Sequence, residues 1–272
     1  MSNDAGWNSM FDLTGKVAVI TGGAQGLGLG MAQGLASFGA EVTLLDVKAE
    51  EVAAAAGQLS KEVGRPIAHM ACDISQQARV QECIASVLDR HKHIDILVNN
   101  AGIHRRVTPV DFKQADLDAV IAVNLLGNYY VTGAVAKQMI EQRAGSIINI
   151  SALGGGIVGL GRGGSIYGIS KGGIVALTRD LAAEWAKYNI RVNSIAPGWM
   201  RTPITVPLQN DPARSQKVLE RVPLRRWGVP KDVAGLAVFL ASDASSYITG
   251  VTIPVDGGAA NTIMLEEMVP PA

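Results

Sequence analysis

A phenol and an ammonium group stand four residues apart in the stretch SIYGISKGG, residues 165–173, as Tyr167 and Lys171. On a helix this spacing places both side chains on one face, one turn apart. A tyrosine can donate a proton to a reacting group or, in the reverse direction, remove one. A free tyrosine has a pKa of about 10, and a neighbouring ammonium is expected to lower it. The pair therefore indicates a proton-transfer device; the alternative is a solvated surface pair.

Short apolar runs that alternate with helical patterns surround this pair. Strands are expected at 16–21, 41–46, 66–73, 94–99, 146–151, 190–197 and 250–258. The longest helices are expected at about 116–142 and 167–189, with Ser75 capping the start of one shorter helix and Gly64 the end of another. Repeated strand–helix units predict a doubly wound α/β fold, with a parallel sheet of about seven strands and helices on both faces. The absence of a linker pattern predicts a single domain over 1–272.

A glycine-rich turn, TGGAQGLG at 21–28, lies where the first strand becomes the first helix. Gly22, Gly26 and Gly28 would let the backbone turn tightly and let a pyrophosphate approach the helix N-terminus. Asp46 ends the second strand, where a carboxylate can accept hydrogen bonds from a ribose diol and repel a 2′-phosphate. These features favour NAD over NADP. The alternatives are an ordinary strand-to-helix turn, and an Asp46 that only caps the next helix.

Seven motifs in a fixed order make the sequence resemble the short-chain dehydrogenase/reductase family over nearly its whole length. They are TGGAQGLG, CDI (72–74), NNAG (99–102), Asn124, NIS (149–151), YGISK (167–171) and APG (196–198). The resemblance implies a nicotinamide-dependent oxidoreductase that acts on CH–OH groups, with one Rossmann-like domain and a dimeric or tetrameric assembly. The implied catalytic residues are Asn124, Ser151, Tyr167 and Lys171, with Asn124 holding a water in the proton path and Lys171 also reaching the nicotinamide ribose.

The resemblance also implies a set of cofactor-binding residues. Asp73 and Ile74 would lie near the adenine, and NNAG beside the central strands. The segment from Pro197 to Thr202 would meet the nicotinamide end. The full set is Gly22, Gln25, Gly26, Leu27, Gly28, Asp46, Asp73, Ile74, Asn100, Ala101, Gly102, Tyr167, Lys171, Pro197, Gly198, Met200 and Thr202.

The serine of the expected catalytic set is ambiguous. The family usually places it thirteen residues before the tyrosine, where this chain has Gly154. Aligning the strand IINIS instead puts Ala152 at the usual serine position. Ser151 is the preferred candidate; Ser165, or orientation of the carbonyl without a serine, are the alternatives. Successive residues of a strand face opposite ways, so a shift of one residue decides the matter.

Two regions of the sequence are expected to contact the substrate. Arg105 and Arg106 follow NNAG at the carboxyl end of the fourth strand, where a guanidinium could hold a carboxylate, unless the pair is merely solvated. The segment from Trp199 to Trp227 is expected to form a substrate lid, with Trp199, Gln209 and Arg214 as contacts. Within the family, GIHRR (102–106) and RRWG (225–228) resemble bacterial enzymes of sugar acids. A sugar acid or polyol is thus the expected substrate. The alternatives are small aryl or cyclic ketones, an NAD-using epimerase or dehydratase, and a non-catalytic dinucleotide-binding regulator.

Composition and residue spacing argue against several other classes of protein. The formal net charge of zero and the lack of a basic run argue against nucleic-acid binding. The N-terminus lacks a signal-peptide pattern, and no apolar run is expected to be long enough to cross a bilayer. Cys72 and Cys83 suggest no disulfide framework, and the four histidines form no metal-ligand spacing with them. We therefore expect a cytoplasmic enzyme without metal. Apolar residues on several faces of the two long helices predict a homotetramer, to which the C-terminal IMLEEMVPPA would add apolar surface.

Overall fold

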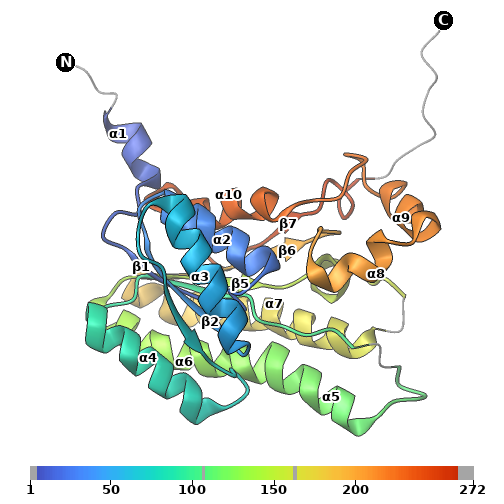
Figure 1. Ribbon diagram of the computed structural model, residues 1–272, viewed down its shortest axis with the longest axis horizontal. Helices are drawn as coiled ribbons and strands as arrows, with labels where there is room; N and C mark the ends of the chain where they lie inside the picture. The colour runs from blue at the N-terminus through green and yellow to red at the C-terminus, as the bar shows by residue number, and fades with distance from the viewer. Residues whose placement is uncertain (1–4, 106–107, 162–163, 263–272) are drawn as a thin grey trace, which may run out of the picture.

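A seven-stranded parallel sheet forms the centre of the protein (Figure 1). The computed structural model describes residues 5–105, 108–161 and 164–262. The strands are β1 (Val17–Thr21), β2 (Glu41–Asp46), β3 (Ala68–Ala71), β4 (Ile96–Asn99), β5 (Gly145–Ile150), β6 (Ile190–Pro197) and β7 (Thr252–Val255). Their order in the sheet is β3-β2-β1-β4-β5-β6-β7. The predicted Rossmann-like doubly wound fold is confirmed.

Two layers of helices cover the sheet, one on each face (Figure 1). Helices α2 (Gly26–Ser37), α3 (Ala49–Val63) and α10 (Pro230–Ala241) lie on one face, and α4 (Gln77–His91), α6 (Asn128–Gln142) and α7 (Ser165–Trp185) on the other. Alternate residues of β1 enter the two cores: Ala18 and Ile20 pack with the first layer, Val17 and Val19 with the second. Burial on both faces explains why the strands read as continuous apolar runs.

The direction of winding reverses between β1 and β4. From β1 the chain winds outward to β2 and β3, then returns to place β4 on the other side of β1. At such a reversal the connections after the two strands diverge and leave a crevice at their carboxyl ends. The glycine turn follows β1 and NNAG closes β4, so both motifs meet at this crevice.

The long helix expected at 116–142 is present but is not uniform. It consists of α5 (Gln114–Ile121), a π-helical turn η2 (Ala122–Gly127) and α6. By length and composition this helix could cross a bilayer, so the expectation that no segment reaches that length is wrong. Val120, Val131, Val135 and Met139 are fully buried within the fold, as in the core helix of a globular protein.

Several helix and strand ends differ from those predicted. Strand β3 spans only four residues, since Cys72 and Asp73 already lie outside the strand and lead into the turn before α4. Ser75 does not cap α4, since its hydroxyl donates to Asp73 Oδ1 at 2.7 Å and the helix begins at Gln77. Gly64 ends α3 in the left-handed conformation as predicted, with φ of 69°.

Short helices complete the chain. They are α1 (Ala5–Asn8), η1 (Ser9–Phe11), η3 (Leu153–Ile157), η4 (Ala186–Tyr188), η5 (Pro203–Thr205), α8 (Val206–Gln209), α9 (Pro212–Leu219) and η6 (Asp243–Ser245). Helices η5, α8 and α9 lie in the segment expected to be a lid. A small core of Val218, Val222 and Trp227, with Trp199 packed against it, holds this segment together.

Candidate active site

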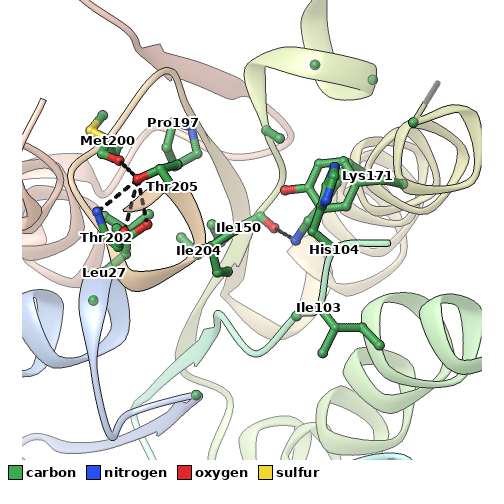
Figure 2. A pocket seen from close by; sticks show the side chains of 18 of the residues that line it. Leu27, Ile103, His104, Ile150, Lys171, Pro197, Met200, Thr202, Ile204 and Thr205 are labelled. Carbon is green, nitrogen blue, oxygen red and sulfur yellow. Dashed lines mark hydrogen bonds between the residues drawn. The ribbon is translucent and has the colours of Figure 1, made fainter. Parts of the chain in front are cut away.

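One cavity of about 1300 Å³ runs along the carboxyl ends of the strands, from the glycine turn to helices η5, α8 and α9. Sixteen of the seventeen residues expected to bind a cofactor line it; the exception is Gly28. Figure 2 shows the part of the cavity where Leu27, Met200, Thr202 and Thr205 lie on one side and Ile103, His104 and Lys171 on the other. The topology thus brings residues from all parts of the sequence to one site.

The glycine turn leaves open space in the cavity that side chains at the same positions would fill. Gly22 has a φ of +65°, and a Cβ there would lie 2.9 Å from Ala101 Cα. Gly28 lies beneath the turn, where a Cβ would collide with the Gly22 carbonyl oxygen. Helix α2 begins at Gly26, so its unpaired N–H groups face the cavity. The missing side chains and the helix N-terminus fit a pyrophosphate group.

Asp46 lies at the end of β2 and lines the cavity. Its Oδ2 accepts a hydrogen bond from Ala24 N, and its Oδ1 one from Lys48 N, both at 3.1 Å. The carboxylate thus stabilises the local backbone and still faces the cavity. Lys48, the nearest cation in the sequence, forms an ion pair with Glu51 at 2.8 Å.

Helix α7 brings Tyr167 and Lys171 into the cavity, as their spacing predicted. Lys171 Nζ lies 5.8 Å from the centroid of the Tyr167 ring and donates to the Ile150 carbonyl oxygen at 2.7 Å (Figure 2). Burial raises the pKa of Tyr167 to about 12 and lowers the pKa of Lys171 to about 8. The pKa of Tyr167 is therefore raised rather than lowered in this structure, and burial is its cause.

Asn124 is fully buried in the π-helical turn η2, behind the cavity wall. Its Oδ1 accepts from Ile103 N at 2.8 Å, and its Nδ2 donates to Ile103 O at 2.9 Å and to Ser170 Oγ at 3.2 Å. Its own carbonyl oxygen accepts from Asn128 Nδ2 at 2.6 Å. The side chain therefore fixes the backbone that follows NNAG. The water that it is expected to hold stays a prediction.

Ser151 lines the cavity, but its hydroxyl is engaged by β6. Its hydroxyl donates to the Ile195 carbonyl oxygen on β6 at 3.1 Å and accepts from Ser194 Oγ at 2.9 Å. This geometry counts against the choice of Ser151 as the catalytic serine. Ala152 follows in extended conformation and lines the cavity with its methyl group. Ser165 also lines the cavity, but it stands two residues before Tyr167 on α7 and so faces another side of the helix.

Only some of the residues expected to contact the substrate line the cavity. Trp199 and Arg214 line the cavity. Arg105 does not, because its side chain points to solvent and pairs with Asp116 at 3.5 Å, so the expectation for it is corrected. Arg106 lies outside the described residues. Gln209 is engaged within the lid, where its Nε2 donates to Thr205 Oγ1 at 2.7 Å.

Sequence reasoning missed His104, which lines the cavity and packs its ring on Tyr167. The two ring centroids are 5.0 Å apart with an interplanar angle of 61°. The available signal is its place two residues after NNAG, beyond the carboxyl end of β4. The residue types there favour the adjacent arginines as substrate contacts, and a lone histidine without metal-ligand spacing gives a weaker local signal.

Comparisons with known proteins identify the family of the chain. A family model described as enoyl-(acyl carrier protein) reductase matches residues 22–260. The chain is 42% identical to 2-dehydro-3-deoxy-D-gluconate 5-dehydrogenase of Escherichia coli strain K12, over 92% of this chain and 97% of that protein.

Solved structures give the same result. A gluconate 5-dehydrogenase from Burkholderia cenocepacia J2315, in complex with NADP and tartrate, is similar with a TM-score of 0.89 and 38% identity, covering 94% of this chain and 99% of that one. Levodione reductase is similar with a TM-score of 0.87 and 34% identity, covering 92% and 99%. The chain therefore belongs to the short-chain dehydrogenase/reductase family of oxidoreductases that act on CH–OH groups with a nicotinamide dinucleotide.

Proposed function

We propose that this protein transfers a hydride between NAD(H) and the secondary alcohol or ketone of a polar substrate, a sugar acid or a polyol. The observation that carries the proposal is the placement of Tyr167 and Lys171 in the same cavity as the glycine turn and Asp46. A proton-transfer pair and a dinucleotide cradle that share one space fit a reaction in which hydride and proton reach the same carbonyl group.

Bound dinucleotide would donate or accept the hydride. During reduction, the Tyr167 hydroxyl donates its proton to the substrate oxygen as the hydride arrives at carbon, and it regains a proton from water. Its pKa of about 12 keeps the phenol protonated at neutral pH, which suits an acid. During oxidation the phenol must first lose that proton, so the positive charge of Lys171 becomes important in this direction.

Asp46 and Lys48 support NAD over NADP. A 2′-phosphate beside Asp46 would meet a carboxylate, and Lys48, which could compensate, is paired with Glu51. The NADP present in the Burkholderia relative favours the opposite choice, so the cofactor preference is a proposal that kinetics must decide.

The names of the sugar-acid relatives support a polyhydroxylated acid as substrate. Arg214, on α9 of the lid, is a cation on the cavity wall suited to a carboxylate. The runner-up is a small cyclic or aryl ketone. Its support is the apolar wall formed by Ile103, Leu153, Leu160, Ile204 and Leu208, together with the similarity to levodione reductase.

We further propose one domain, with a lid at about 199–227, in a cytoplasmic homotetramer that binds neither nucleic acid nor membrane. Leu126, Tyr129 and Ile169 on the long helices are 42%, 57% and 62% exposed, and this apolar surface suits pairing with a second copy. The C-terminal IMLEEMVPPA, expected to add apolar surface, lies outside the described residues. Light scattering at micromolar concentration should give a tetrameric mass; a monomeric mass would refute the assembly.

A substrate panel tests the reaction. Sugar acids, polyols and cyclic or aryl ketones are offered with NAD(H) and with NADP(H), in both directions. Release of free oxidised product with stoichiometric NADH supports a dehydrogenase and excludes an epimerase. Tyr167→Phe should lose nearly all turnover and still bind NADH. Substantial activity in Tyr167→Phe would overturn the mechanism.

A further inference from the structure

A carbonyl oxygen that becomes an alkoxide gains negative charge, and its lone pairs allow it to accept more than one hydrogen bond. Tyr167 supplies one hydrogen bond and the proton. A second aligned donor on the same oxygen stabilises the developing charge, an effect worth about a hundredfold or more in turnover. The question is which side chain of this cavity can be that donor.

Three hydroxyl groups that line the cavity already donate to backbone carbonyl oxygens, and Ser165 faces another side of α7 than Tyr167. Carbonyl oxygens only accept hydrogen bonds, so each hydroxyl bonded to one has used its single proton. Ser151 gives its proton to Ile195 O at 3.1 Å, Thr108 to Asp111 O at 3.2 Å, and Thr205 to Met200 O at 2.6 Å (Figure 2).

The surroundings of Ser151 reinforce its exclusion. A Cβ placed on Gly156 would lie 3.2 Å from Ser151 Oγ, so the loop backbone packs against that hydroxyl. The next residue, Ala152, reaches the cavity wall but carries no donor. Lys171 donates one of its three N–H groups to Ile150 O at 2.7 Å, which holds the ammonium group against the end of β5 beside the Tyr167 ring.

His104 combines a donor group with contact to Tyr167. Its ring centroid lies 5.0 Å from that of Tyr167, and its side chain lines the cavity. An imidazole has two ring nitrogens, so one can bond to the protein while the other donates to a ligand. Figure 2 shows His104 on the same side of the cavity as Lys171, away from Met200 and Thr202.

The backbone that carries His104 is held in place. Asn124 bonds both the N–H and the carbonyl oxygen of Ile103, the preceding residue, at 2.8 and 2.9 Å. Asn124 itself sits in a π-helical turn, a feature often found at functional sites. A donor used in a transition state must be pre-positioned in this way.

We propose that His104 is a catalytic residue that donates the second hydrogen bond to the reacting oxygen of the substrate. This proposal rests on the proposed function, because it assumes a carbonyl group beside Tyr167. It assigns to a histidine on the loop after β4 the carbonyl-polarising role for which Ser151 and Ser165 are the candidates in the sequence.

Two substitutions separate donation from packing. His104→Phe keeps an aromatic ring against Tyr167 and removes the donor, whereas His104→Gln keeps an N–H donor and removes the ring. We expect His104→Phe to lower kcat about a hundredfold, which is the scale for loss of one aligned donor. The kcat of His104→Gln should stay within about tenfold of the wild-type value, because this variant keeps a donor. NADH affinity, measured by fluorescence titration, should be unchanged in both. The reverse order, or near-wild-type kcat in His104→Phe, overturns the proposal.

A binding measurement does not depend on knowing the substrate. 2,2,2-Trifluoroethanol, an acidic alcohol that imitates the alkoxide, is titrated calorimetrically into each variant saturated with NAD. We expect His104→Phe to bind it about tenfold more weakly than the wild type, and His104→Gln to bind it about equally, a difference of about 1.4 kcal/mol. Equal affinity in all three proteins overturns the proposal. A different result is that the three proteins show the expected order of affinities for this alcohol while the wild type oxidises or reduces no compound of the panel. That result overturns the proposed function alone.

Discussion

Asn124 holds Ile103 by both of its backbone polar groups, with Oδ1 2.8 Å from Ile103 N and Nδ2 2.9 Å from Ile103 O. These two residues are 21 positions apart in the chain. One side of the active-site cavity is thereby fixed to the long helix through a single buried amide. The consequences for activity and stability can be separated by mutation.

Asn124→Ala should lose both stability and turnover. Removing the amide leaves the Ile103 N–H and carbonyl without their partners, a cost of about 1–3 kcal/mol in unfolding free energy. The loop that carries His104 would also become less ordered, so kcat should fall by more than the stability loss explains. Denaturant unfolding and steady-state kinetics measure the two effects.

Asn193→Ala is the matched control for that variant. Asn193 is also fully buried, and its amide also bonds two backbone groups, Ile248 O at 2.9 Å and Val251 N at 3.3 Å. It does not line the cavity. Similar destabilisation with nearly unchanged kcat is expected. Equal losses of kcat in both variants would show that Asn124 acts only through global stability.

Asp46→Ala should shift the cofactor preference towards NADP. The carboxylate that repels a 2′-phosphate is removed, so the ratio of kcat/KM for NAD to that for NADP should fall about tenfold or more, equivalent to about 1.4 kcal/mol. Glu51→Ala is a milder companion, because it frees Lys48 from its ion pair at 2.8 Å. It should raise NADP use without affecting NAD. An unchanged ratio in Asp46→Ala would remove the basis for proposing NAD.

Local patterns predicted the parts of the site that depend on local geometry. The spacing of Tyr167 and Lys171 on a helix requires only helical periodicity, and the glycine turn requires only a strand before it and a helix after it. The orientation of Ser151 depends instead on its pairing with Ile195, 44 residues away, which no local pattern contains. The exclusion of Arg105 likewise depends on Asp116, in the first turn of α5.

The histidine was missed for a related reason. His104 acquires its place from Asn124 and from the approach of Tyr167, and both belong to helices later in the chain. The π-helical turn that positions Asn124 has the same composition as an ordinary helix, so the sequence predicted one continuous helix there. Residue types could suggest a donor at this position, but only the fold shows that its ring lies on the tyrosine.

Lys171→Met should stabilise the protein at neutral pH while abolishing turnover. Burial lowers the pKa of Lys171 to about 8 from 10.5. Below pH 8 the ammonium charge is therefore buried in the folded protein, whereas it is exposed to water in the unfolded chain. The corresponding cost is about 3 kcal/mol, reduced by the hydrogen bond to Ile150 O that methionine would lose.

The sign of the pH dependence follows from the lowered pKa. Between pH 8 and 10.5 the unfolded chain binds the lysine proton more strongly, so the wild type regains this stability as pH rises. The advantage of Lys171→Met in unfolding free energy should therefore be largest below pH 8 and shrink towards pH 10. Measurements stop at pH 10, because above it the raised pKa of Tyr167 adds an opposite dependence. Lys61→Met, at an exposed position on α3, should show no such trend. A pH-independent difference would mean that Lys171 is not buried as a charge.

Ala152→Ser should restore activity to an enzyme that lacks the His104 donor. Ala152 continues from β5 in extended conformation, with φ of −160° and ψ of 158°. Successive residues of such a segment face opposite ways, and Ser151 faces β6, so a hydroxyl at position 152 would enter the cavity. In the His104→Phe background, Ala152→Ser should raise kcat about tenfold or more by supplying a replacement donor to the reacting oxygen.

In the wild-type background the same substitution should change kcat by less than about threefold, because the donor position is already served by His104. Ser151→Ala combined with His104→Phe is the control: the hydroxyl it removes already donates to Ile195 O, so kcat should stay at the level of His104→Phe alone. Steady-state kinetics of the four variants with one ketone and NADH completes the cycle. A large gain from Ala152→Ser in the wild type, with none in His104→Phe, would show that the two side chains do not serve the same oxygen.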